Sequence, residues 1–181
     1  MHPAIFLDRD GVIIENRSSY VRSWKHVAIY PQALPALARI SASAYKIVMV
    51  TNQSAVGRGV ITLTAAWEIN YRLVKAIEQA GGRIDGVFMC PHAPEEGCDC
   101  RKPKPGLIER AAESLGLDLS RSILIGDALS DIQAGQAAGV GQTALVCTGL
   151  GEEQARLAKA RTLEPFAIFD SLDEALAALV G

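Results

Sequence analysis

Short, almost purely apolar runs recur along this chain and alternate with stretches long enough to form helices. Because these runs lack the apolar-polar alternation of a half-exposed strand, they are typical of strands buried on both faces of a sheet. This pattern restricts the chain to folds in which helices cover a central sheet. The predicted strands are residues 4–7, 46–50, 86–89, 122–125, 143–147 and 167–169.

The segments between these runs carry signals for helices. Helices are predicted at residues 32–43, 63–80, 105–115, 129–138 and 152–160, with one more at the C-terminal end. Glycines at 81–82, 116 and 139 are placed to end three of them, and Ser171 with Glu174 forms a capping-box pattern that opens the last one. Strands alternating with helices predict an α/β fold, a doubly wound, mainly parallel, Rossmann-like sheet with helices on both faces.

Length and composition fit one globular domain that spans residues 1–181. The chain has 181 residues, 49% of them apolar, a net charge of -2 and 21% charged residues. The absence of a basic bias argues against a nucleic-acid partner. The apolar runs are far shorter than the ~20 residues of a membrane-spanning helix, so no membrane partner is expected. We expect a cytoplasmic monomer with reduced cysteines.

Polar residues follow several of the predicted strands, where a parallel sheet gathers its ligands. They supply a carboxylate pair, a hydroxyl with two amides, one ammonium group and two further carboxylates. Metal-assisted attack on a phosphate ester requires a nucleophile, a proton donor, charge neutralisation and a divalent ion, so these groups predict a phosphatase. They are Asp8 and Asp10; Thr51, Asn52 and Gln53; Lys102; and Asp127 and Asp131.

Each of these residues also has a purely structural interpretation. An Asp after a strand is often a turn or cap residue, and Thr51-Asn52 could cap a helix. Lys102 could be a solvated surface charge, and Asp127 to Asp131 could simply place negative charge in the first turn of a helix. The structural interpretation needs four coincidences in one order, which favours the catalytic one.

A second cluster contains three cysteines and a histidine. Cys90, His92, Cys98 and Cys100 form the pattern C-x-H-x5-C-x-C, which suits a closed tetrahedral structural zinc site. Reduced cysteines beside a surface histidine are the alternative that spacing alone leaves open. A metal would fix the loop at about residues 90–100.

Four motifs together resemble those of the haloacid dehalogenase (HAD) superfamily of phosphotransferases. They are residues 6–12 (FLDRDGV), residues 50–54 (VTNQS), Lys102-Pro103, and residues 126–131 (GDALSD). The sequence around the cysteines and TNQS is similar to the subfamily of D-glycero-D-manno-heptose 1,7-bisphosphate phosphatases and histidinol phosphatases. That similarity strengthens the zinc prediction. A cap domain is not expected, because only about 40 residues separate the first two motifs.

The resemblance implies a role for each catalytic residue. Asp8 is expected to attack phosphorus and form an aspartyl-phosphate, and Asp10 to act as general acid and then as general base. Arg9 should point the other way and be structural. Mg²⁺ is expected on the carboxylates of Asp8 and Asp127 and the backbone carbonyl of Asp10. Asp131 should orient Lys102 or a metal-bound water.

The substrate is expected to be a small phosphorylated metabolite, most simply a heptose 1,7-bisphosphate. Thr51 and Asn52 should hold the phosphoryl oxygens, with Lys102 neutralising their charge. Further substrate contacts are predicted for Gln53, Arg101, Arg17, Tyr20 and Arg58. Histidinol phosphate or another small ester is an alternative substrate, and a zinc-stabilised protein that binds phosphate without turnover is an alternative of a different class. Ala128 departs from the subfamily, which often has Lys there.

Overall fold

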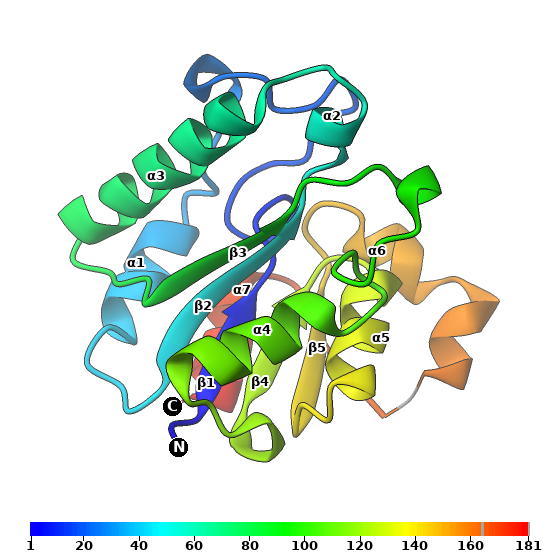
Figure 1. The fold of residues 1–181 in the computed structure, drawn as a ribbon. Coiled ribbons are helices and arrows are strands. Elements are labelled where there is room, and N and C mark those ends of the chain that lie inside the picture. The colour runs from blue at the N-terminus through cyan, green and yellow to red at the C-terminus, as the bar shows by residue number, and fades with distance from the viewer. Residues whose placement is uncertain (164, 181) are drawn as a thin grey trace.

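Six parallel strands form one sheet at the centre of the computed structural model, which describes residues 1–163 and 165–180 (Figure 1). The strand order is β3-β2-β1-β4-β5-β6, so β1 lies inside the sheet, between β2 and β4. The predicted doubly wound α/β fold is confirmed. The strands are β1 Ala4–Leu7, β2 Lys46–Asn52, β3 Gly86–Cys90, β4 Ile123–Gly126, β5 Gln142–Val146 and β6 Ala167–Phe169.

Helices cover both faces of this sheet. Side chains of α1, α3 and α7 pack in one buried cluster, and side chains of α4 and α5 pack in a second. Successive residues of the central strands alternate between the two clusters, as Ile5 and Phe6 do in β1. The helices are α1 Ala33–Arg39, α2 Ser54–Gly57, α3 Leu63–Gln79, α4 Gly106–Leu115, α5 Leu129–Ala137, α6 Gly151–Ala155 and α7 Leu172–Leu179.

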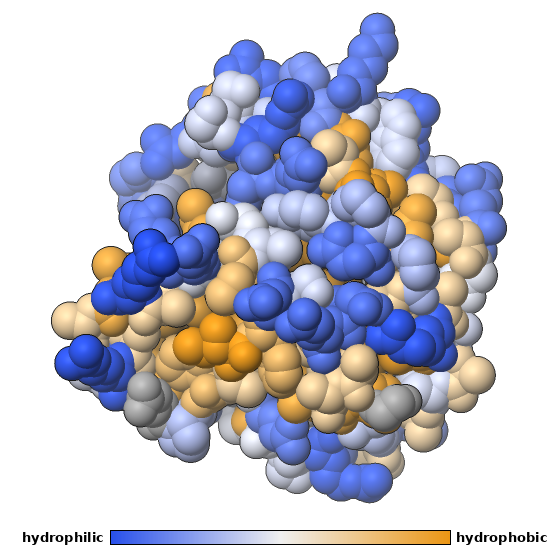
Figure 2. All heavy atoms as spheres, turned by 180° about the vertical axis from the view of Figure 1, so that it is seen from behind, coloured by the Kyte–Doolittle hydropathy of each residue, from blue (hydrophilic) through white to orange (hydrophobic). Residues whose placement is uncertain are grey.

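Short 3-10 turns complete the described chain. They lie at Trp24–His26, Pro94–Glu96, Leu119–Arg121 and Ala158–Thr162. No helix in residues 1–163 and 165–180 is long and apolar enough to cross a membrane. On the face opposite to that of Figure 1, hydrophilic residues dominate the upper half and hydrophobic ones gather in the lower half (Figure 2).

The predicted helix at 152–160 is wrong as a single element. The chain forms α6, leaves helical geometry at Leu157 and then makes the 3-10 turn Ala158–Thr162. Only Gly151 and Ala160 are buried in this region, so no continuous apolar stripe holds one helix against the core. α1 also ends four residues before the predicted end of its helix, and α2 was not predicted.

The predicted end signals have mixed outcomes. Gly116 follows α4 in the left-handed conformation, with φ of 63°, as expected of a glycine at a helix end. The Ser171 hydroxyl accepts a hydrogen bond from the Glu174 amide at 3.4 Å, which is one half of the predicted capping box. The Glu174 carboxylate accepts instead from the Asp170 amide, one residue before the cap.

Candidate active site

The candidate site lies where strand order reverses, between β1 and β4. Crossovers leave these two strands in opposite directions across the sheet, which opens a crevice beyond their carboxyl ends. Asp8 follows β1 directly, and Asp127 follows β4. The Asp8 amide donates a hydrogen bond to the Ile125 carbonyl at 3.0 Å, which holds the two strand ends together.

Lys102 is the buried cation of the site. Its Nζ lies 2.6 Å from Asp131 Oδ1 and 2.9 Å from Asp8 Oδ1, and it donates to the Val50 carbonyl at 2.9 Å. Burial alone would lower the pKa of this ammonium, but attraction to Asp131 and Asp8 outweighs it and raises the pKa above its ordinary value. Lys102 is therefore fixed as a permanent positive charge beside Asp8.

Asn52 fixes the backbone of that lysine. Its Nδ2 donates to the Lys102 carbonyl at 3.1 Å, and its Oδ1 accepts from the Lys102 amide at 3.1 Å. The side-chain amide is thus engaged by the protein itself, and its predicted contact with a phosphoryl oxygen stays a prediction. Thr51 is fully buried, and its hydroxyl accepts a hydrogen bond from Gln53 at 2.8 Å.

Asp127 is the carboxylate most affected by its surroundings. Its Oδ2 accepts hydrogen bonds from Asn16 Nδ2 at 2.6 Å and from the Leu150 amide at 2.9 Å. Burial, with repulsion from Asp8 and Asp131, nevertheless raises its pKa to about 7. The hydrogen bonds to Asp127 therefore do not compensate for the burial of its negative charge and for the carboxylates nearby.

Three carboxylates lie close enough together in this crevice to bind one ion. Asp8, Asp127 and Asp131 each offer an oxygen, and these oxygens lie within 4.8 Å of one another. Burial and the nearby Asp8 raise the pKa of Asp131 to about 6, although Lys102 opposes the rise. Hard oxygen ligands around unbalanced negative charge suit a divalent cation such as Mg²⁺. Asp131 has both oxygens engaged, Oδ1 by Lys102 and Oδ2 by the Ala128 amide at 3.1 Å, whereas Asp8 meets Lys102 and the Arg9 amide through Oδ1 alone. Asp8 and Asp127 are therefore the better candidates for ligands.

Asp10 lines the same cavity but is held by a separate network. Arg9 Nη2 lies 2.9 Å from Asp10 Oδ2, and Gln53 Nε2 donates to the same oxygen at 2.9 Å. Arg9 also donates to Asn70 Oδ1 on α3 at 2.8 Å. The expectation that Arg9 points away from Asp10 is wrong, because β1 ends at Leu7 and side-chain alternation does not extend to these residues.

Two glycines, Gly11 and Gly149, pack closely against the Asp127 carboxylate. Gly11 has φ of +81° and Gly149 has φ of +61°, both in the region that favours glycine. A Cβ on Gly11 or on Gly149 would overlap Asp127 Oδ2. Any side chain at either position would therefore displace the Asp127 carboxylate.

The cavity above these groups has a volume of about 260 Å³. Asp8, Asp10, Gln53, Lys102, Asp127 and Asp131 line it, together with Arg17 and Tyr20. Arg101 and Arg58 are outside this lining. Arg101 donates to the His92 carbonyl at 3.3 Å, and Arg58 pairs with Glu95 at 3.0 Å. Their predicted substrate contacts stay predictions.

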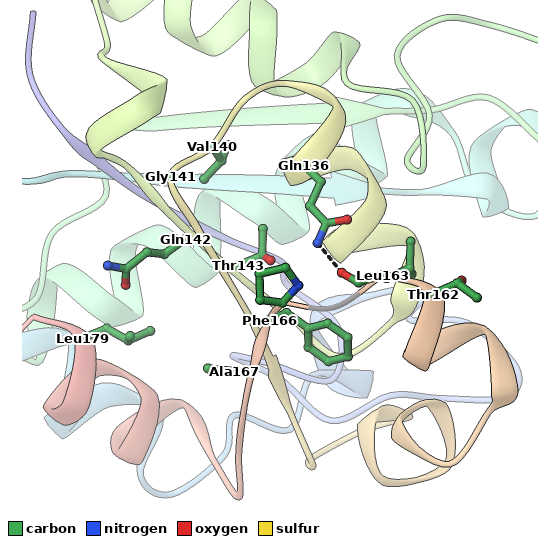
Figure 3. A pocket seen from close by; sticks show the side chains of 11 residues that line it. Gln136, Val140, Gly141, Gln142, Thr143, Thr162, Leu163, Phe166, Ala167 and Leu179 are labelled. Carbon is green, nitrogen blue, oxygen red and sulfur yellow. Dashed lines mark hydrogen bonds between the residues drawn. The ribbon is translucent and has the colours of Figure 1, made fainter.

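A larger cavity, of about 670 Å³, lies at the opposite end of the sheet (Figure 3). Its lining includes Gln142 and Thr143 at the start of β5, Gln136 on α5 and Phe166 before β6. None of the described lining residues is charged. The smaller cavity, which combines carboxylates with a buried lysine, is therefore the one equipped for chemistry.

The predicted Cys/His cluster also comes together. Cys90 Sγ lies 3.6 Å from His92 Nδ1 and 3.6 Å from Cys98 Sγ. Cys100 Sγ lies 3.3 Å from that nitrogen and 3.5 Å from Cys98 Sγ. Tetrahedral zinc with bonds of about 2.0 to 2.3 Å has edges of about 3.3 to 3.8 Å, so the donor atoms fit a structural zinc.

Several residues of the site were not predicted as contacts. Asn16 and the Leu150 amide bind Asp127, and Asn70 binds Arg9. Asn70 is 61 residues from its partner and Asn16 is 111 from its own, so no local motif links them. A buried Asn within the apolar face of α3 was the one signal available for Asn70.

Known proteins resemble this chain over most of its length. The HAD-hydrolase-like family model matches residues 99–175. The D-glycero-beta-D-manno-heptose-1,7-bisphosphate 7-phosphatase of Neisseria meningitidis serogroup A is 37% identical over 168 residues, covering 93% of this chain and 89% of that protein.

Two solved structures extend the similarity to the fold. The D,D-heptose 1,7-bisphosphate phosphatase of B. bronchiseptica, complexed with magnesium and phosphate, has a TM-score of 0.90, 34% identity and 98% coverage of both chains. The corresponding phosphatase from Burkholderia thailandensis has a TM-score of 0.74 and 28% identity, and the match covers 99% of each chain.

Proposed function

This chain belongs to the haloacid dehalogenase-like hydrolases, among the heptose-1,7-bisphosphate 7-phosphatases, and we propose that it hydrolyses D-glycero-D-manno-heptose 1,7-bisphosphate in a Mg²⁺-dependent reaction. It is a phosphoric monoester hydrolase of the HAD type. The observation that carries the proposal is the pairing of Lys102 with both Asp8 and Asp131, beside Asp127, at the β1/β4 crevice.

Asp8 is the proposed nucleophile. Asp8 lines the cavity, and the Lys102 ammonium 2.9 Å from its carboxylate offsets the negative charge that an approaching phosphate adds. Attack on phosphorus forms an aspartyl-phosphate as the bond to the leaving alcohol breaks. Asp10 donates the proton that the alcohol needs, then takes one from the water that hydrolyses the aspartyl-phosphate.

Asp8 and Asp127, with the backbone carbonyl of Asp10, are the proposed ligands of Mg²⁺. When bound, the ion supplies positive charge to the phosphoryl oxygens and to the crowded carboxylates. The raised pKa of Asp127 supports its place in this set, because a buried carboxylate short of positive charge gains from a cation. Asp131 orients Lys102 through the 2.6 Å contact.

Cys90, His92, Cys98 and Cys100 are the proposed ligands of a structural zinc. Four protein donors leave no open position for substrate, so the ion would hold the loop at residues 90–100 and, two residues further on, Lys102. A cytoplasmic location, a monomeric state and one domain over residues 1–181 stay predictions from the sequence.

The decisive experiment is phosphate release by the purified protein, with and without Mg²⁺, on three substrates. We expect the highest kcat/KM for the heptose bisphosphate, with fructose 1,6-bisphosphate and histidinol phosphate well below it. A preference for histidinol phosphate would assign the chain to that reaction instead. No release from any ester would favour the phosphate-binding alternative.

A further inference from the structure

Asp10 has its two carboxylate oxygens in unequal surroundings. Oδ2 accepts hydrogen bonds from Arg9 Nε at 3.0 Å and from Gln53 Nε2 at 2.9 Å, and it lies 2.9 Å from Arg9 Nη2 in the ion pair. Among the described residues, Oδ1 accepts one hydrogen bond, from Arg9 Nη2 at the longer distance of 3.2 Å. A proton on Oδ2 would displace two hydrogen bonds beside the Arg9 charge, whereas a proton on Oδ1 displaces a single longer one.

The guanidinium that creates this asymmetry is fixed from behind. Arg9 is 1% exposed, and its Nη1 donates to Asn70 Oδ1 at 2.8 Å. With one edge on Asp10 and the other on Asn70, the planar group cannot rotate without breaking hydrogen bonds at both ends. The Asp10 carboxylate is thereby fixed in one orientation.

Asn70 is placed in α3 where packing alone would favour an apolar residue. It is 1% exposed and lies between the buried Ile69 and Leu73 of the same helix. A buried amide is costly unless it is hydrogen-bonded, and the second contact of Asn70, with Met89 Sδ at 3.5 Å, is weak. The bond to Arg9 is therefore the interaction that accounts for this residue.

We propose that Arg9 and Asn70 are a positioning pair that holds Asp10 so that its Oδ1 delivers the proton to the leaving group. The inference rests on the proposed phosphatase function. Oδ1 gives its proton to the ester oxygen as the Asp8 oxygen bonds to phosphorus and the ester bond breaks. The resulting carboxylate later takes a proton from a water whose oxygen bonds to phosphorus as the bond from phosphorus to Asp8 breaks, which releases phosphate and restores the acid.

The leaving group provides the test. A sugar alkoxide needs a proton to leave, whereas p-nitrophenolate leaves without one. The value of kcat/KM covers the steps up to departure of the alcohol, so it isolates the acid role of Asp10 from its later base role. Asn70→Ala should lower kcat/KM for the heptose bisphosphate by about 10-fold to 100-fold, which is part of the roughly 10²- to 10⁴-fold that general acid catalysis contributes. For p-nitrophenyl phosphate, the loss should be at most about 3-fold, because little acid catalysis is needed.

Three further variants separate positioning from general damage. Arg9→Lys keeps the charge but not the two-edged geometry, and should reproduce the selective loss. Ile69→Val, a conservative change beside Asn70, should affect neither substrate selectively. In an Asp10→Asn background, Asn70→Ala should cause no further loss on the heptose bisphosphate, because the pair acts through Asp10.

Equal losses on both substrates, or full additivity of Asn70→Ala with Asp10→Asn, would overturn the positioning role. These results differ from a failure of the proposed function itself, in which the unmodified protein would release phosphate from neither ester in the presence of Mg²⁺. Thermal unfolding of each variant shows whether it is folded before kinetics are compared.

Discussion

Replacing Asp127 by Asn should stabilise the protein in the absence of Mg²⁺ at neutral pH, even though it removes a proposed metal ligand. Burial raises the pKa of this carboxyl from 3.8 to about 7, so the folded chain resists its ionisation. Asn has the same shape, and its oxygen can still accept the hydrogen bonds from Asn16 and the Leu150 amide. Its amide can donate toward Asp8, where Asp127 placed negative charge.

The magnitude and its pH dependence follow from the two pKa values. Between pH 4 and pH 7 the unfolded chain has lost this proton and the folded chain has kept it, so stability falls as pH rises. Each unit of difference between the two pKa values corresponds to about 1.4 kcal/mol, so the full cost of the ionised carboxylate at pH 8 is on the order of 4 kcal/mol. At pH 5 it is on the order of 1 to 2 kcal/mol, since little of the difference has yet developed.

Urea unfolding at pH 5 and pH 8 measures this effect, in buffers depleted of Mg²⁺ but without a strong chelator that would strip the Cys/His cluster. Asp127→Asn should raise the free energy of unfolding more at pH 8 than at pH 5. Saturating Mg²⁺ should stabilise the unmodified protein by roughly 3 kcal/mol at 100 times Kd, and the variant hardly at all. Glu113→Gln, which removes an exposed carboxylate of α4, is the matched control and should show neither effect. A variant less stable than the parent at pH 8 would refute this account of Asp127.

Three other outcomes are expected. Asp8→Asn should abolish Mg²⁺-dependent phosphate release because it removes the nucleophile. Asp10→Asn should slow the release by about 10² to 10⁴ because it removes the general acid. Near-normal release by Asp8→Asn would exclude an aspartyl-phosphate. The purified protein should hold about one zinc by elemental analysis, and Cys98→Ser should lose both the metal and activity that added Mg²⁺ does not restore; protein without zinc, with all cysteines open to titration, would disprove the site. Arg17→Ala should raise KM for the heptose bisphosphate more than for a monophosphate ester, because Arg17 lines the cavity and is the cation proposed to bind the far phosphate. Arg161→Ala, at an exposed arginine, is the control. Equal changes in both KM values would show that Arg17 does not recognise the far phosphate.

The sequence determined the sheet well because its strands are buried on both faces. Runs such as Ile47 to Val50 have no polar alternation, and this places them in the sheet's interior. Asp8, Lys102 and Asp127 could be predicted to converge because each lies at a strand end or a loop on one rim. Such positions can be predicted only where the chain keeps regular strand or helix geometry.

Other features could not be predicted from local patterns. Arg9 turns toward Asp10 because β1 ends at Leu7 and the chain then bends through Gly11. The partners of Arg9 and Asp127 come from α3 and from the loop around Asn16, and nothing local specifies such distant contacts. Arg58 and Arg101 were predicted from charge alone, which does not reveal that Glu95 and the His92 carbonyl engage them.

The close packing of Gly11 and Gly149 against Asp127 limits which positions around the site can be substituted. A methyl group on Gly11 or Gly149 would overlap the Asp127 carboxylate, so even the smallest substitution there disturbs the reacting end of the pocket. Arg17, Tyr20 and Ser130 line the cavity without that restriction. A protein that evolves to accept a new phosphate ester would therefore change these lining residues and keep the two glycines. Directed evolution toward other substrates should accumulate substitutions at Arg17, Tyr20 and Ser130 and none at the two glycines.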